Sequence, residues 1–431
     1  MLVSIGDALA NIDDFKNAED ALKKALTRSR KFYGTNSLET ANILSDLANY
    51  NHEIQNYKHA EDYIFEALAI DSTINGPSSE SIVSKLSIFA SNQFLQSKYQ
   101  TAKKYFHLAD SLKQAYGLTN TPEYYTLLGN LGETELYLGD YKKAEEHFSQ
   151  VLNFYKNYCE REHKNIAMTQ YRLGLLYNRK SQYKKAETYL LKSLDGYKAA
   201  LGENNSNLSA TYAMLARNYR LVGDFREAQR YAQKDADLTK NLFGDTSAIY
   251  AKSLNNLAMM QKAQGKITAA KYNYRLSLSL YQKHLEKDNP DLAIPLYNLA
   301  DVEMALGNYQ KAHQLIKRVV KIDKNRLGSQ HPEVGLDLNK MGAILTKAQN
   351  FSEANSVFEE AKSIFLEEFP ENHYRIGEYF VNYGILKLKQ QNKTVANEYF
   401  EKALNIFKSN FDDDHKRIID TKKYLAKSNS N

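Results

Sequence analysis

The chain has 431 residues, of which 43% are hydrophobic and 12% aromatic, and this composition excludes a disordered protein. Its net charge of +6 comes from 57 basic and 51 acidic residues with no run of five like charges, so the sequence does not indicate nucleic-acid binding. The single cysteine excludes an internal disulfide and favours a reducing compartment, and we expect a cytoplasmic protein.

The chain shows no sign of membrane insertion or of division into linked domains. No apolar stretch approaches the roughly 20 residues that a membrane helix needs. The first 15 residues, MLVSIGDALANIDDF, lack a basic region and carry Asp7 within their apolar stretch, so they do not resemble a signal peptide. Only 19 glycines and 6 prolines are present, and no linker rich in Gly, Ser or Pro separates one part from another. One continuous body is therefore expected.

One pattern recurs along the whole chain with a step of 42 residues and no insertion or deletion over ten copies. The copy LGDYKKAEEHF, which ends at Phe148, returns for example as IQNYKHAEDYI and LGNYQKAHQLI. An alanine follows three residues after the anchor in all ten copies. The anchors are Phe15, Tyr57, Tyr99, Tyr141, Tyr183, Phe225, Ile267, Tyr309, Phe351 and Lys393.

Each copy is predicted to be two helices joined by a short turn. Apolar residues within a copy recur every three to four positions, which is helical spacing. A second column of Gly or Ala lies nine residues before each anchor, for example Gly132, Ala300 and Gly342. The two small columns mark where helices approach closely. A single helix pair of this size cannot bury its own apolar face, so the copies must stack into a solenoid with a continuous core.

The anchor pattern resembles the tetratricopeptide repeat, in which an L-[GA] pair, an aromatic residue and an alanine recur. The step of 42 residues, LNNLA at 254–258 and GSQHPEV at 328–334 are similar to the kinesin-light-chain type. The resemblance implies an all-α fold, a right-handed α-solenoid of ten antiparallel helix pairs plus a terminal helix at about 415–427. Ile267 and Lys393 depart from the aromatic anchor. We expect one array, with repeats at 1–36, 37–78, 79–120, 121–162, 163–204, 205–246, 247–288, 289–330, 331–372 and 373–414.

His331, within GSQHPEV, is the first candidate for a catalytic or metal-binding residue, but its position in the 42-residue repeat indicates the start of a helix. The same column of the other repeats holds mostly Ser, Thr or Asn, which cap helix amino termini through a side-chain acceptor. Pro332 follows it at a position where proline is tolerated, and Gly328 precedes it where helices end. We therefore predict that His331 is an N-cap and not a catalytic or metal-binding group.

The sequence predicts no enzyme, no cofactor and no metal site. Cys159 and His163 alone would supply half of a zinc site, but Cys159 occupies a column of apolar helix-end residues, and zinc needs about four ligands. No phosphate-binding glycine loop, nucleophile elbow or HExxH motif is present.

Function is expected on the groove that, by the resemblance, the first helices of successive repeats line. The fifth to seventh repeats place basic, amide and aromatic side chains there, with no Asp or Glu among them. The arginine guanidinium binds carboxylates through paired N–H donors, and an Asn side chain can both donate to and accept from a peptide backbone. We therefore expect a protein or peptide partner with acidic residues. The candidate binding residues are Tyr171, Arg172, Arg179, Arg217, Arg220, Lys252, Asn255, Asn256, Lys262 and Asn298.

Two alternatives to a binding scaffold remain open on the sequence alone. The array could be the regulatory or sensor part of a larger protein, such as a caspase-like protease or a sensor kinase, whose effector domain is absent here. It could also be an assembly scaffold that self-associates through its terminal repeats.

Overall fold

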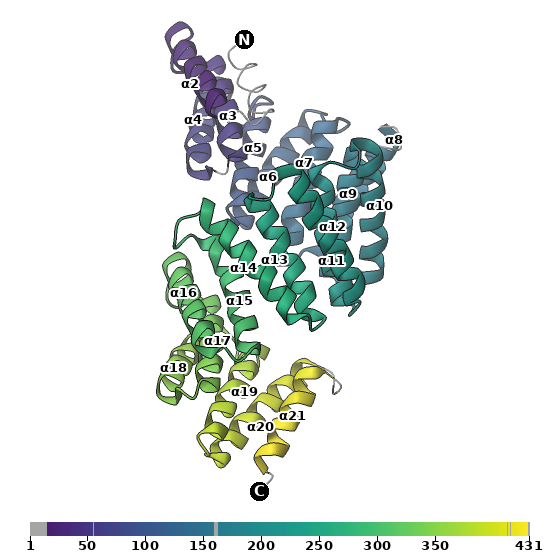
Figure 1. Cartoon of the computed structure of the whole chain (residues 1–431). Helices are drawn as coiled ribbons and strands as arrows, with labels where there is room; N and C mark the ends of the chain where they lie inside the picture. The colour runs from purple at the N-terminus through teal and green to yellow at the C-terminus, as the bar shows by residue number, and fades with distance from the viewer. Residues whose placement is uncertain (1–14, 55, 159–162, 412, 414, 430–431) are drawn as a thin grey trace. The chain divides into compact units, whose positions relative to one another are not determined.

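The computed structural model describes residues 15–54, 56–158, 163–411, 413 and 415–429, and this part of the chain contains 20 α-helices, one 3₁₀-helix and no strand (Figure 1). The predicted all-α solenoid of antiparallel helix pairs is confirmed. The helices form two compact units, residues 1–203 and 204–431. This division falls one residue before the boundary predicted between the fifth and sixth repeats. The first helix of repeat one and Cys159 lie outside the described residues.

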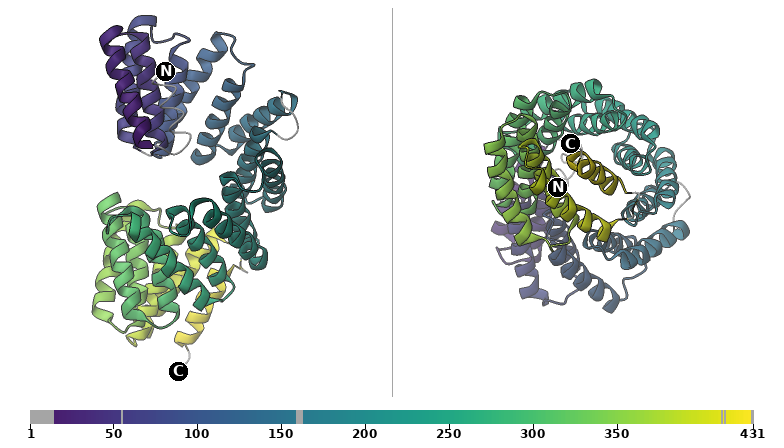
Figure 2. Two further views of the ribbon diagram at one scale, coloured as in Figure 1. Left: turned by 45° about the horizontal axis from the view of Figure 1, so that its top comes forward. Right: turned by 90° about the horizontal axis from the view of Figure 1, so that it is seen from below.

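In the described part of the first unit, each of the second to fifth repeats contributes two helices that pack on one another and on the neighbouring repeat (Figure 2). Its apolar core includes Leu22, Leu44, Leu47 and Ile64, all buried. The helices are α2 (Phe15–Phe32), α3 (Leu38–Glu53), α4 (Tyr57–Asn75), α5 (Ile82–Leu95), α6 (Tyr99–Ala115), α7 (Pro122–Leu138), α8 (Tyr141–Tyr158), α9 (Lys164–Arg179) and α10 (Tyr183–Leu201).

The second unit continues the same alternation of first and second helices and ends on a single further helix, α21. One apolar cluster runs through it from Ala258 to Leu386. The helices are α11 (Ser206–Leu221), α12 (Phe225–Phe243), α13 (Ala248–Ala263), α14 (Ile267–His284), the 3₁₀-helix η1 (Pro290–Leu292), α15 (Ala293–Ala305), α16 (Tyr309–Leu327), α17 (Pro332–Lys347), α18 (Phe351–Glu368), α19 (Tyr374–Lys389), α20 (Lys393–Asn410) and α21 (Lys416–Asn429).

The anchor residue of the sequence pattern is the first residue of the second helix in each of the second to tenth repeats. Two residues before it, the turn between the paired helices has a positive φ in each of the third to tenth repeats. Glycine takes this position in four repeats, for example Gly307 with φ of 80°. The other four repeats hold a left-handed Ser or Gln, which costs more because the Cβ atom crowds the backbone. These residues are Ser97, Ser181, Gln349 and Gln391.

His331 caps helix α17, as the sequence predicts. Its Nδ1 accepts a hydrogen bond from the backbone N–H of Glu333 at 3.2 Å, and Pro332 stands at the first helical position. His163, His373 and His415 cap α9, α19 and α21 in the same way. All four histidines therefore act as N-caps of first helices through a ring nitrogen acceptor. The serine of this column in the third repeat, Ser79, does not cap its helix, because α5 begins only at Ile82.

The two small columns lie where helices cross, as the sequence indicates. All ten alanines that follow the anchors are buried, with at most 1% of their surface exposed. A Cβ atom added to Gly342 would come within 2.6 Å of the Phe358 ring, and one added to Gly384 within 2.6 Å of the Phe400 ring. These glycines therefore let the paired helix approach closely enough to bury an aromatic ring. Among the described helices, none combines the length and apolar character that crossing a bilayer requires.

Candidate functional site

The second unit carries two adjacent cavities that are lined mainly by first helices. One has a volume of about 1120 Å³ and the other about 700 Å³. Tyr297 on α15 and Leu336 on α17 line both of them. Because the first helices of successive repeats contribute side chains at the same positions of the frame, the two cavities are parts of one inner surface.

The larger cavity, here called the basic cavity, is lined from α11, α15, α17, α19, α20 and α21. Five basic side chains face two acidic ones, a balance of +3. Several of these charges are compensated within the chain. Arg417 pairs with Glu378, and Lys340 donates to Asp301 at 2.7 Å. The basic residues are Arg220, Lys340, Arg375, Lys416 and Arg417, and the acidic ones are Glu378 and Asp420.

Arg220 forms no ion pair in the described part of the chain, and it is more buried than Lys416 of the same cavity. Its side chain is half-buried, and its buried Nε has no hydrogen-bond partner among the described residues. Burial, and next the charge of Arg217, lower the pKa of Arg220. A buried guanidinium without a counter-charge is costly, so an anionic group placed in this cavity would be favoured.

Two pairs of asparagines cross the inner surface at equivalent positions. Asn298 donates from Nδ2 to Asn255 Oδ1 at 3.1 Å, and Asn382 donates to Asn339 Oδ1 at 3.2 Å. Each pair uses one donor and one acceptor, although two amide side chains offer more of both. The remaining groups could bond the N–H and C=O groups of an extended peptide.

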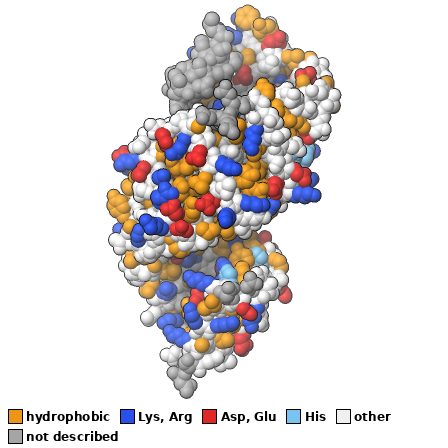
Figure 3. All heavy atoms as spheres, turned by 90° about the vertical axis from the view of Figure 1, so that its right-hand side faces the viewer, with side chains coloured by type: hydrophobic (Ala, Val, Ile, Leu, Met, Phe, Trp, Pro, Cys, Tyr) orange, Lys and Arg blue, Asp and Glu red, His pale blue; other side chains and the backbone are white. Residues whose placement is uncertain are grey.

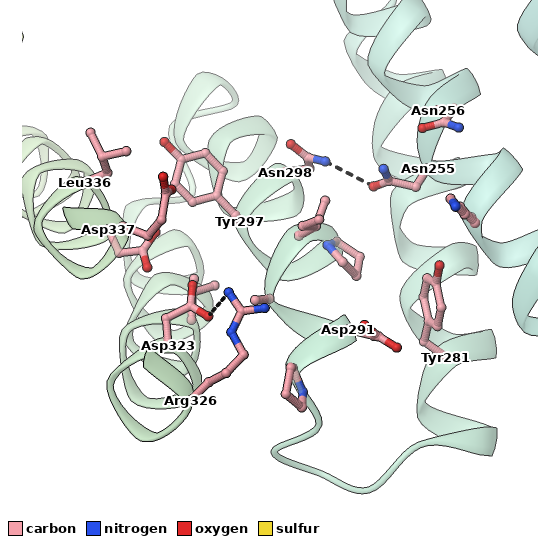
Figure 4. Close-up of a pocket in the computed structure, with 17 residues that line it drawn as sticks. Asn255, Asn256, Tyr281, Asp291, Tyr297, Asn298, Asp323, Arg326, Leu336 and Asp337 are labelled. Atoms are coloured by element: carbon pink, nitrogen blue, oxygen red, sulfur yellow. Dashed lines mark hydrogen bonds and ion pairs between the residues drawn. The ribbon is translucent and has the colours of Figure 1, made fainter. Parts of the chain in front are cut away.

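The smaller cavity, here called the acidic cavity, is lined by four carboxylates and two basic side chains (Figure 4). Asp323 on α16 and Asp337 on α17 are both buried, with 6% and 5% of their surface exposed. Arg326 forms an ion pair with Asp323 Oδ1 at 3.1 Å, and neither Asp323 Oδ1 nor Asp337 Oδ2 has a hydrogen-bond partner in the described part of the chain. Burial, and next the charge of Asp323, raise the pKa of Asp337 to about 8.

Half of the predicted binding residues line these two cavities. Arg220 belongs to the basic cavity, and Lys252, Asn255, Asn256 and Asn298 belong to the acidic one. The other two predicted residues of this unit line neither. Arg217 is exposed, and Lys262 pairs with Asp301.

The remaining predicted residues, Tyr171, Arg172 and Arg179, lie on α9 in the first unit. Arg172 is committed to partners within the chain, because it bonds Glu133 at 2.9 Å and Asn130 at 3.0 Å. Arg179 lies over the ring of Tyr137, 5.0 Å from its centroid. Tyr171 is half-buried and makes contacts of its own. A peptide would have to displace Glu133 to reach Arg172.

Sequence reasoning missed the acidic cavity because its carboxylates lie outside the predicted groove positions. Asp323 lies fourteen residues after its anchor, on a second helix, and Asp337 lies fourteen residues before the next anchor. The sequence does hold an indication of this site. The equivalent positions of the second and third repeats carry an opposite-charge pair, Asp71 and Lys85, whereas the eighth and ninth repeats carry two aspartates there.

Outside the cavities, charge is mixed. On the face drawn in Figure 3, basic and acidic side chains alternate over short distances and apolar side chains lie among them.

The chain matches the sequence profile described as Tetratricopeptide repeat over residues 1–73, 165–234, 250–325, 291–367 and 337–409, and a second profile of the same description over residues 125–158. Together the first set covers well over half of the chain. The protein belongs to the tetratricopeptide repeat family, whose arrays are protein-interaction scaffolds. No protein of curated function matches it significantly.

Solved structures share the fold at low sequence identity. The apo form of the quorum sensor NprR from B. thuringiensis is 14% identical, with a TM-score of 0.55 over 84% of this chain and 97% of that one. The apo form of RapI is also 14% identical, with a TM-score of 0.51 over 70% and 99%. Kinesin-light-chain-like repeats are represented by a putative kinesin light chain of Podosopora anserina, 22% identical over 47% and 96%, with a TM-score of 0.42.

Proposed function

We propose that the protein is a non-catalytic scaffold that binds an extended peptide, or a flexible segment of a protein, along the inner surface of the second unit. The basic cavity receives acidic side chains of the partner. The asparagine pairs bond its backbone. A single cysteine in the whole chain is in keeping with a reducing compartment such as the cytoplasm.

Arg220 carries the proposal. It is a half-buried cation whose Nε has no partner among the described residues, and it opens into a cavity with three more basic than acidic side chains. A carboxylate of the partner would supply the missing charge and accept from the guanidinium fork. The volume of about 1120 Å³ lies just above the range common for small-ligand sites and suits several residues of a peptide.

The test is an array of acidic, neutral and basic peptides probed with the full chain and with Arg220→Gln/Lys416→Gln at low and physiological salt. Both residues line the basic cavity. We expect acidic peptides to bind, to weaken as salt rises and to lose at least about tenfold in affinity in the variant. The matched control is Arg226→Gln/Lys240→Gln on α12, which removes the same charge away from both cavities.

If the control variant loses as much binding as the cavity variant, the effect is one of net charge and the proposal fails. It also fails if acidic peptides bind no better than neutral ones.

The two alternatives from the sequence stay as predictions with their own tests. A sensor module would be recognised by an effector domain in the complete gene product. Self-association through the terminal repeats would appear as an increase of mass with concentration in light scattering.

A further inference from the structure

We propose that the acidic cavity is a subsite for an organic cation, the guanidinium or ammonium group of an Arg or Lys side chain of the bound peptide. The proposal deepens the proposed function, on which it rests for the identity of the ligand. The subsite itself can be tested with a small cation alone.

Asp337 is the first observation. Its carboxyl group is 95% buried, lines the cavity and leaves Oδ2 without a hydrogen-bond partner in the described part of the chain. Its neighbour across the helix interface is a second carboxyl group, Asp323. Two buried carboxylates side by side repel each other unless a proton or a cation lies between them.

The second observation comes from the equivalent place in the first unit. Asp71 and Lys85 occupy the two columns that Asp323 and Asp337 occupy six repeats later. There Lys85 Nζ lies 2.8 Å from Asp71 Oδ2, and both side chains are almost fully buried, at 4% and 0% exposure. The fold thus accommodates an ammonium group against this aspartate. In the eighth and ninth repeats the lysine is replaced by Asp337, and a cavity of about 700 Å³ opens beside the pair.

The other walls of the cavity suit an organic cation carried by a peptide. Besides Asp323, the charged groups around Asp337 are Lys252 on α13, Asp291 on η1, Arg326 on α16 and Glu333 on α17, and the phenols of Tyr281 and Tyr297 lie on α14 and α15. Four carboxyl groups against two cations leave a formal balance of −2 when all are ionised. The Tyr297 ring already lies under a cation, with Lys340 Nζ 5.5 Å from its centroid, so it is suited to cation–π contact. The Asn298–Asn255 pair at the far wall is placed for the peptide backbone (Figure 4).

A metal ion is a poorer occupant than a guanidinium. In the described residues, no group of three His, Cys, Asp or Glu side chains converges as metal ligands would. A protein site for calcium would supply about six or more oxygen ligands. A planar guanidinium can pair with one carboxylate, and Asp337 supplies it, because Asp323 already pairs with Arg326.

In the empty cavity, a proton takes the place of the ligand. Burial and Asp323 raise the pKa of Asp337 to about 8, so at neutral pH this carboxyl group is protonated and can donate to Asp323. A bound cation favours the charged carboxylate and expels that proton. Affinity for a permanently charged ligand should therefore rise with pH up to about 8 and then level off.

The test uses N-acetylarginine methylamide and its neutral isostere N-acetylcitrulline methylamide as probes of the intact protein, with ligand-observed NMR and calorimetry. We expect the arginine probe to bind at least about tenfold more tightly than the citrulline probe. Its affinity should increase from pH 6 to pH 8, and its binding heat should depend on the ionisation enthalpy of the buffer. In Asp337→Asn the preference for arginine and the pH dependence should both disappear.

A second variant tests the cation subsite by filling it, without removing a polar side chain. Asp337→Lys would recreate the Asp71–Lys85 pair and fill the subsite with a tethered ammonium, so the arginine probe should no longer bind to a folded protein. The matched control is Asp237→Asn, an exposed carboxylate on α12 that bonds Gln233, and it should bind the probe as the wild type does.

Equal binding of the two probes to the wild type, including no detectable binding of either at millimolar concentration, overturns the proposal. So does a loss of binding in Asp237→Asn as large as in Asp337→Asn. The peptide array separates this failure from that of the proposed function. Acidic peptides that bind through Arg220 but are indifferent to Asp337→Asn would leave the scaffold function standing and remove the cation subsite.

Discussion

Asn298 donates a hydrogen bond to Asn255 at 3.1 Å, and two repeats later Asn382 donates the equivalent bond to Asn339. The pairs keep the four amides oriented across the inner surface before any ligand arrives. We predict that Asn298→Ala weakens binding of an array-selected peptide by about 1–2 kcal/mol, because a peptide group then loses its partner. Titration by fluorescence anisotropy measures the loss. Asn273→Ala on α14, which loses a bond to Gln261 outside both cavities, should bind normally.

Asp337 should make the stability of the protein depend on pH. Its pKa is about 8 in the folded chain against 3.8 for an ordinary aspartate, so between these values the folded state holds a proton that the unfolded state has released. The free energy of unfolding therefore falls as pH rises through this window and levels off above about 8.

Asp337→Asn should remove that contribution, so that the variant is less destabilised than the wild type on going from about pH 5 to about pH 8.5. Urea titrations at the two pH values measure the difference, with Asp237→Asn as the control. Parallel behaviour of wild type and Asp337→Asn would show that the pair of carboxyl groups is not strained.

The left-handed turn residues offer an opportunity to stabilise the fold. Ser181 and Gln349 have φ of 56° and 62° at a position where other repeats use glycine. Ser181→Gly and Gln349→Gly should each raise the free energy of unfolding by about 0.5–1 kcal/mol, because relief of the left-handed conformation exceeds the entropy cost of glycine. The reverse change, Gly307→Ala, should lower it. Denaturant titration checks all three, and stabilisation by Gly307→Ala would contradict the explanation.

His373 should make the tenth repeat sensitive to acid. Its Nδ1 accepts from the N–H of Arg375, and its ring stacks on Phe369 with centroids 4.3 Å apart. Burial, and next the charge of Arg375, lower the pKa of His373. The folded state therefore prefers the neutral ring, and this stability is complete above the ordinary histidine pKa and is lost as pH falls below it.

His373→Asn should keep an N-cap acceptor and remove the dependence on pH near 6, whereas His373→Ala should cost about 0.5–2 kcal/mol near neutral pH and less in acid, where the wild type loses the same cap. Hydrogen exchange of the first amides of α19 measures both effects. His59→Asn, an exposed histidine on α4, should change neither. A wild-type cap that is equally protected at pH 7 and pH 5 would refute this role.

The repeating parts of the fold were predictable, because the same pattern of residues recurs in ten copies. Every second helix from the second to the tenth repeat begins at the anchor residue, and His331 and His373 cap helices because their column does so in other repeats. The acidic cavity was not predictable in this way. It depends on Asp323 and Asp337, which lie on helices of different repeats and matter only as a pair. The hydrogen bond from Arg172 to Glu133 likewise joins two different repeats, and an alignment of single repeats does not reveal such contacts.

The constant step of 42 residues has a consequence for how this protein can vary in length. The second helices of the second to tenth repeats start at the same position of the 42-residue pattern, and the left-handed turn of the third to tenth repeats keeps a fixed distance from it. A recombination between copies that are out of step by whole repeats would therefore join intact turns to intact helices. The reach of the inner surface, and the order of cavities along it, can in this way change in whole units while every local junction is preserved.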